Sequence, residues 1–424
     1  MRQRGWFGIF ALMVPATSAF GQSTSGHVGM LPEGASVADR SRPEYAPIGG
    51  RIGSFFIYPE FGLTGEATDN VLATADDRRS DLNTVLSSKV SLQSDFTRHT
   101  LDLSAHYDRS FHARQTSEDA SRYGARLDGR YDIAADSWLA ISGSADRDVE
   151  PRTSFNSPVG ALEPSHYTRD GVTLNAQRTT GRLTVGAGGS VTALRFASVE
   201  FPDGQSLSQL YRDSNTFAGN LMVGYEFRPG IRAIARATFD KIDYTLSAND
   251  PRQPSHLNRA SHGLRMEAGL RFELTSLLTG EARIGYLRRD YSSVQLRDTA
   301  GFSFGADLLW NVTNLTSLRF NADKRVDEAA SATIAGNRIT EFGLAADHEY
   351  RRNLILSASV RHITIAPLGP SPAGHEIRAD AGARLLISRR VSLRLGYRFA
   401  DRTSANADHT YRENRVSIAT LVTF

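Results

Sequence analysis

The sequence predicts an all-β protein, a closed antiparallel transmembrane β-barrel of eighteen strands. Three observations predict it. From about residue 54 to the end, segments of about ten to fifteen residues alternate apolar with polar side chains, as a strand with two different surroundings requires. The connections between segments are short and long in turn, and aromatic residues sit at segment ends beside the short connections.

The alternation is clearest in "VSLRLGYRF", where Val391, Leu395 and Phe399 share one face and Arg394 and Arg398 the other. A soluble β-sandwich also alternates in this way. These segments are longer than the usual strand of about five or six residues, and they match the length that a tilted strand needs to cross a bilayer. The length favours a membrane barrel.

The connections indicate which rim faces which compartment. Short links such as "AADS", "TTG", "RPG" and "RRN" take turns with long polar loops such as "PRTSFNSPVGALEPS" and "SANDPRQPSHLN". Outer-membrane barrels have short periplasmic turns and long extracellular loops. Trp138, Trp310 and Tyr350 adjoin short turns, which predicts a periplasmic aromatic girdle.

The predicted strands follow one another along the chain, separated only by turns and loops. Because lipid offers no hydrogen bonds, the sheet must close on itself, and an even strand number returns the C-terminus to the periplasmic side. A barrel this wide encloses an aqueous channel, which loops can narrow. Sixteen strands are the alternative if the first pair does not form. The segments start near residues 55, 83, 99, 119, 137, 166, 182, 209, 231, 258, 278, 297, 315, 336, 354, 375, 391 and 410.

Composition excludes other classes. No run of 18 apolar residues occurs after the N-terminus, which excludes a helical membrane protein. The chain has no cysteine, which excludes disulfides, thiolate metal sites and a lipoprotein anchor.

The sequence also predicts how the chain is divided. Residues 1–21 are predicted to form a signal peptide, with a basic start "MRQR", an apolar core "GWFGIFALMV" and small residues "ATSAFG" for cleavage. Residues 22–53, rich in Gly, Pro and Ser, predict a flexible periplasmic lead-in, and 54–424 the barrel.

The C-terminal "RVSIATLVTF" places Val416, Ile418, Val422 and Phe424 on one strand face. This ending resembles the β-signal that the barrel-assembly machinery reads, although Thr420 is polar where a larger apolar residue is common. The resemblance implies that these four residues form an assembly signal. We expect the last strand to pair with the first, "FFIYPEFGLT", and close the ring.

A second stretch narrows the family. "YPEFGLTGEATDNVLAT" and the following "SSKVSLQSDFTRHTLDLSAHYDRSF" resemble the opening of the putative β-barrel porin 2 family, which includes EpsL-like proteins. The resemblance implies a bacterial outer-membrane channel that takes part in exopolysaccharide export or surface handling. Its implied partners are outer-membrane lipid, periplasmic polysaccharide-export components and an anionic glycan, with no nucleic acid. The alternatives are a general diffusion porin for small solutes and a non-conducting structural or adhesive surface barrel.

The predicted inner face is strongly ionic, and two interpretations stay open. A wide barrel needs a hydrated, charge-paired wall to stay rigid, and acids share this face with the arginines. Alternatively, the arginines form an electropositive lane for an anionic glycan. The arginines expected to line the lumen are Arg122, Arg126, Arg232, Arg236, Arg265, Arg283, Arg361, Arg378, Arg384, Arg394 and Arg398.

The sequence predicts no enzyme, no cofactor and no metal site. Ser104, His106 and Asp108 share one strand face, but residues at i and i+2 project in parallel. A nucleophile and its base must converge to hydrogen-bond distance. No phosphate loop, GxSxG, HExxH or Ca²⁺-loop pattern occurs. His106 is expected to line the lumen.

Overall fold

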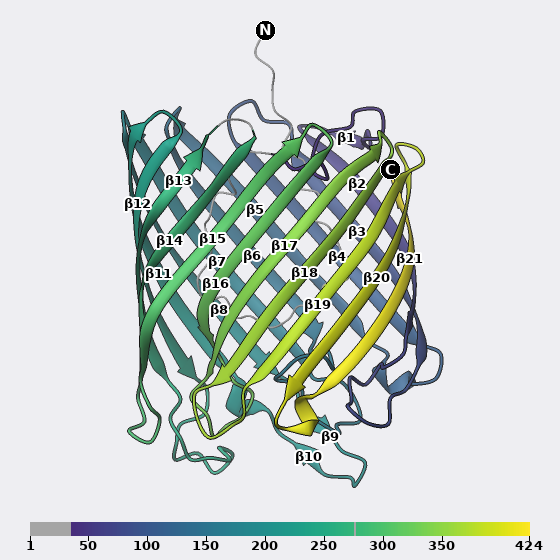
Figure 1. Cartoon of the computed structure of the whole chain (residues 1–424), viewed down its shortest axis with the longest axis vertical. Coiled ribbons are helices and arrows are strands. Elements are labelled where there is room, and N and C mark those ends of the chain that lie inside the picture. Colours follow the sequence, from purple (N-terminus) through teal and green to yellow (C-terminus); the bar gives the residue numbers. More distant parts are fainter. Residues whose placement is uncertain (1–34, 275–276) are drawn as a thin grey trace.

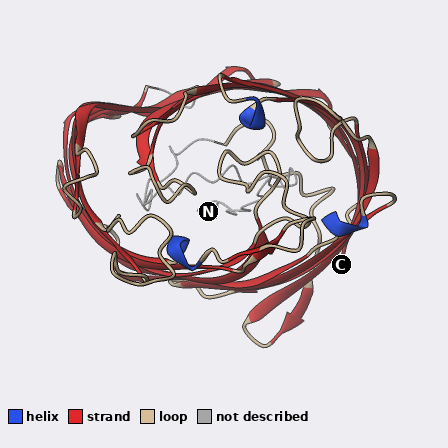
Figure 2. Cartoon of the chain, turned by 90° about the horizontal axis from the view of Figure 1, so that it is seen from below, coloured by secondary structure: helices blue, strands red, loops and turns tan. Residues whose placement is uncertain are grey.

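The computed structural model describes residues 35–274 and 277–424, and these form one closed barrel (Figures 1 and 2). Eighteen long antiparallel strands follow one another around the ring in chain order, and the short β1 (Gly50–Ile52) is added beside the start of the first. The long strands are β2 (Phe55–Thr68), β3 (Asp81–Ser94), β4 (Thr100–His112), β5 (Ser121–Ala134), β6 (Ser137–Val149), β7 (His166–Thr180), β8 (Leu183–Phe196), β11 (Ser214–Arg228), β12 (Ile231–Tyr244), β13 (Ser261–Glu273), β14 (Leu278–Tyr291), β15 (Thr299–Thr313), β16 (Thr316–Asp327), β17 (Asn337–Arg351), β18 (Leu354–Pro367), β19 (Gly374–Leu386), β20 (Val391–Ser404) and β21 (Tyr411–Thr423).

The predicted eighteen strands are confirmed. The predicted starts near 209 and 258 precede the observed strands at Ser214 and Ser261, and the other starts agree within two residues. The first of these differences arises because a 3₁₀ turn, η2 (Leu210–Arg212), comes before β11. In the described part of the chain, no helix is long and apolar enough to cross a membrane.

The ring closes where the sequence predicts, between the first and last long strands. β2 and β21 pair antiparallel from Glu60 opposite Thr423 to Thr68 opposite Arg415. The Phe424 amide then donates to the Pro59 carbonyl at 3.0 Å. No sheet edge is left between the first and last strands, as a bilayer requires.

The two faces of the strands differ as the alternation predicts. On β14, Ile284 and Tyr286 are 62% and 52% exposed on the outside of the ring, whereas Arg283 is 4% exposed on the inside. Trp138 differs from the predicted girdle, because it is 8% exposed on the inner face of β6 and lies 4.9 Å beneath the Arg130 guanidinium. Trp138 does lie beside the short turn, as predicted, but the alternation of side chains along β6 places it on the inner face.

Short turns gather at one end of the barrel and long loops at the other (Figure 1). The short turn between β11 and β12 requires a glycine. Gly230 has φ +75°, and a Cβ atom at this position would lie 2.4 Å from the Glu273 carbonyl oxygen. The long-loop end also carries the hairpin β9 (Val199–Glu200) and β10 (Ser206–Leu207) and the 3₁₀ turns η1 (Thr116–Glu118) and η3 (Ala407–His409).

The N-terminal segment differs in part from the expected flexible lead-in. Residues 1–34, including the predicted signal peptide, lie outside the described residues. Residues 35–49 make fixed contacts at the short-turn end of the barrel, where Ser36 and Val37 are fully buried. The polar residues of this segment, whose composition predicted mobility, instead form hydrogen bonds and ion pairs with the charged barrel wall.

Candidate functional site

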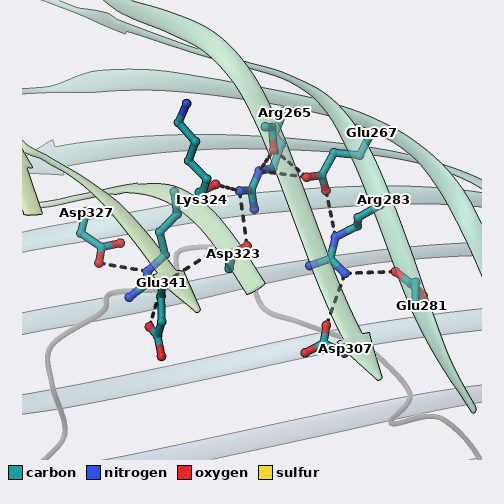
Figure 3. Close-up of polar contacts among 11 residues, drawn as sticks. Arg265, Glu267, Glu281, Arg283, Asp307, Asp323, Lys324, Asp327 and Glu341 are labelled. Atoms are coloured by element: carbon teal, nitrogen blue, oxygen red, sulfur yellow. Dashed lines mark hydrogen bonds and ion pairs between the residues drawn. The ribbon is translucent and has the colours of Figure 1, made fainter. Parts of the chain in front are cut away.

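The inner face of the barrel carries the candidate site, and its densest part is an ionic network on β12–β18. Figure 3 shows the part of this network on β13–β17. Glu267 on β13 binds Arg283 at 3.2 Å and Arg265 at 3.4 Å, and accepts a hydrogen bond from Ser303 at 2.6 Å. Arg265 extends the network to Asp323 on β16 at 3.5 Å. The Glu267 carboxylate thus joins the guanidiniums of Arg265 on β13 and Arg283 on β14.

A second carboxylate in this network contacts three guanidiniums. Glu281 lies 2.6 Å from Arg271, 3.1 Å from Arg236 and 3.2 Å from Arg283. It is 6% exposed. Removing one partner from a buried ionic cluster costs about 3–5 kcal/mol, because it leaves an uncompensated charge. This part of the wall is therefore rigid and charge-paired.

The network continues to β18 with looser contacts. Glu341 on β17 contacts Arg361 at 3.3 Å and Arg325 at 3.4 Å. At the start of the same wall, Arg232 contacts Glu226 at 3.2 Å. All the predicted arginines from β12 to β18 thus have carboxylate partners.

The arginines of β5 and β19–β20 lie in other parts of the ring. On β5, Arg126 binds Asp128 through two bonds of 2.6 and 2.9 Å. Arg122 lies opposite Asp108 in the β4–β5 register. On β19–β20, Arg378 contacts Glu376 at 2.5 Å and Arg398 contacts Asp380 at 2.6 Å, whereas Arg384 and Arg394 lie opposite each other in register.

The loop between β6 and β7, residues 150–165, reaches across the inside of the ring. Its Phe155 packs against Ile339, Ile363 and Ile365, which are buried on the inner faces of β17 and β18. The same ring stacks on His409 of η3, with centroids 4.4 Å apart. Seven strands separate β7 from β17 around one side of the ring and five separate β6 from β20 around the other, so the loop bridges distant walls.

Polar contacts hold this loop, residues 150–165, at its inward part and at its base, and we call it the constriction loop. The Asn156 side chain donates to the Glu328 carbonyl at 3.3 Å and accepts from the Ala330 amide at 3.0 Å. At the base of the loop, the fully buried Glu150 receives two bonds from Arg212, at 2.9 and 3.0 Å. The loop is therefore fixed against the inner wall of the ring rather than projecting into solvent.

A buried arginine joins the neighbouring loops to this constriction. Arg259 is 1% exposed and donates to the carbonyls of Ala329, Ser331 and Tyr211 at 2.8–3.0 Å. Its guanidinium also lies 4.5 Å from the Tyr244 ring centroid. Burial lowers the pKa of Arg259 to about 10, so it stays charged at neutral pH.

Glu328 gives this loop contact a pH dependence. Burial, with a smaller effect of Asp240, raises the pKa of Glu328 from 4.5 to about 8, and its Oε2 is buried without a hydrogen-bond partner among the described residues. The folded state binds more protons than the unfolded state, so the stability of this contact falls as pH rises from about 4.5 through about 8. We expect the Ala330 amide to exchange hydrogen faster at pH 9 than at pH 6, after correction for chemical exchange.

The control for this prediction is Glu328→Gln. The amide stays neutral and has nearly the same shape, so the corrected exchange rate of Ala330 should not depend on pH in this variant. An equal pH dependence in both proteins would mean that another group loosens the loop.

Several residues of the constriction were absent from the sequence prediction. Phe155 is the only aromatic residue within the polar loop "PRTSFNSPVGALEPS", a signal that could have marked an inward anchor. Arg212, Arg259 and Glu328 gave no such signal, because their burial depends on loops that are distant in sequence. Among the described residues, no group of three or more His, Asp or Glu side chains is arranged to hold a metal ion.

One family model and several solved structures match this chain. A family model described as "Putative beta-barrel porin 2" matches residues 42–424. No curated protein matches the chain significantly. Among solved structures, OpdL of Pseudomonas aeruginosa is similar at 12% identity and a TM-score of 0.46, covering 88% of this chain and 99% of that one. A BenF-like porin from Pseudomonas fluorescens Pf-5 (12%, 0.46, 87% and 99%) and OccK2 (OpdF) of P. aeruginosa (13%, 0.46, 88% and 99%) are also similar.

Proposed function

The chain belongs to the putative beta-barrel porin 2 family of outer-membrane proteins, and from this premise we propose that it is a narrow channel for small hydrophilic solutes. The observation that carries the proposal is the constriction loop, which Phe155 and Asn156 anchor on the far wall. A solute must pass the space left beside this loop. The passage is lined by charged and polar groups, which favour hydrated solutes over apolar ones.

Exopolysaccharide export, which the family resemblance implied, is the second candidate, and the geometry favours it less. A polymer would have to pass the anchored loop at one end and the N-terminal segment at the other. Both make buried contacts, through Phe155 and through Val37. Export would therefore require both elements to move.

Planar-bilayer recording and liposome swelling test the proposal together. We expect discrete current steps from the full-length protein, and swelling with monosaccharides that falls steeply for oligosaccharides. A protein that inserts but conducts no ions would contradict a channel and favour a structural or adhesive barrel. Equal swelling with mono- and oligosaccharides would contradict a narrow channel and favour polymer passage.

A further inference from the structure

The N-terminal segment occupies the periplasmic end of the lumen through two kinds of contact. One kind is a buried anchor: the Val37 amide donates to Ser317 Oγ at 2.6 Å, and Arg42 pairs with Glu349 at 2.7 Å. The Arg42 and Glu349 side chains are only 4% and 9% exposed. This anchor fixes where the segment lies.

The other contact is accessible and ionic. The Asp39 carboxylate accepts from Arg319 at 2.8 Å and from Ser36 Oγ at 2.6 Å. The Arg319 and Asp39 side chains are 36% and 38% exposed, so solvent in the lumen reaches this pair. One residue earlier, the Ala38 carbonyl accepts from Arg384 at 2.8 Å. Exposed ion pairs contribute about 0–1 kcal/mol and exchange readily.

Positive charge gathers around this contact. Arg384 lies opposite Arg394 in the β19–β20 register, and Arg42 lies beside the same segment, where it donates to the Val37 carbonyl at 2.8 Å. Two acids lie beside these arginines, since Asp39 and Asp347 contact Arg319 at 2.8 and 3.2 Å. A guanidinium presents a planar fork of donors that fits a carboxylate, so this cluster suits a second carboxylate in the place of Asp39.

We propose that Arg319 and Arg384, with Arg394 beside them, form a carboxylate-binding site at the periplasmic end of the lumen. Asp39 and the Ala38 carbonyl occupy this site as a tethered competitor, which a carboxylate solute displaces while the Arg42–Glu349 anchor stays in place. The site deepens the proposed channel function, on which its role in passage rests, by naming carboxylates as a solute class. The tether keeps Asp39 at a high effective concentration, so it weakens binding of free carboxylates.

Calorimetric titration of the full-length protein with succinate tests the site. We expect Asp39→Asn to bind succinate about fivefold or more tightly than the wild type, because a short tether competes at millimolar effective concentration. Asp95→Asn is the matched control, since Asp95 lies at the same end of the barrel and pairs with Arg51, outside the site. Adding Arg319→Gln and Arg384→Gln to Asp39→Asn should abolish the gain. Equal affinities for Asp39→Asn and Asp95→Asn would overturn the proposal.

Current recordings separate this site from the channel function. If the protein conducts no ions but Asp39→Asn still binds succinate more tightly, the channel proposal fails and the site stands. If the protein conducts but Asp39→Asn alters neither succinate binding nor succinate block, the site fails and the channel stands. Heat-modifiable migration on gels confirms that each variant is a folded barrel before it is measured.

Discussion

Deleting residues 153–161 and joining the ends with a short Gly–Ser link is expected to raise single-channel conductance by about twofold or more, since an eighteen-stranded barrel without an inward loop leaves a wide aqueous channel. The deleted stretch contains Phe155 and Asn156, the two anchors on the far side of the ring. The strands keep their pairing, because the β6–β7 register ends at Val149 opposite His166. Planar-bilayer recording measures the change.

Point variants test the same constriction with the loop still present. Phe155→Ala removes a partly buried ring. Full burial of such a side chain contributes about 1.5–3 kcal/mol, and the partly buried ring contributes less, so the loop should leave its position only part of the time. We expect a smaller rise in mean current with more current noise. Val159→Ala is the matched control, because Val159 lies in the same loop but is 48% exposed.

A control deletion shows whether any shortened loop has this effect. Residues 202–205, at the tip of the β9–β10 hairpin, are exposed at the same end of the barrel. Their removal should leave conductance unchanged. An unchanged conductance in the 153–161 deletion as well would mean that the loop does not limit the passage.

Removing Phe424 is expected to lower the amount of folded protein in the outer membrane strongly, with little change in the conductance of the molecules that do insert. In the folded barrel Phe424 contributes one backbone hydrogen bond to Pro59 and an edge-on contact with Phe61 at 6.4 Å. Such a hydrogen bond contributes about 0.5–1.5 kcal/mol, too little to unfold a closed barrel. A large loss would therefore show that the residue acts during assembly.

Phe61→Ala distinguishes recognition from packing. This variant removes the same ring contact from the β2 side and leaves the C-terminal residues intact. We expect it to assemble almost normally, and Phe424→Tyr to restore assembly. Equal losses in Phe61→Ala and in the truncation, measured by heat-modifiable migration of membrane fractions, would assign the effect to packing and not to an assembly signal.

The wall of the barrel was predictable because its causes are local. Each strand crosses between lipid and water, so its side chains alternate with a period of two, and a one-residue change of register would reverse both faces. The last strand shows this clearly: Val416 and Ile418 are 56% and 55% exposed on the outside, as the alternation of "RVSIATLVTF" predicted. Trp138 is the exception, since aromatic character suggested a girdle position and its strand parity placed it inside.

The contents of the barrel depended on contacts that no local pattern encodes. Phe155 meets β17 and β18 about two hundred residues later in the chain, and Asp39 meets Arg319 at a separation of 280 residues. Polar composition predicted a flexible lead-in for the N-terminal segment and a long extracellular loop after β6, and it did not indicate which segments enter the lumen. The charged inner wall offers such segments ion-pair and hydrogen-bond partners that are held in place, which bulk solvent does not. Closing the ring brings these partners close to the segments. The sequence by itself determined the strands, their faces and the closure, because lipid and water act on each strand separately, whereas only the tertiary structure decided what narrows the passage.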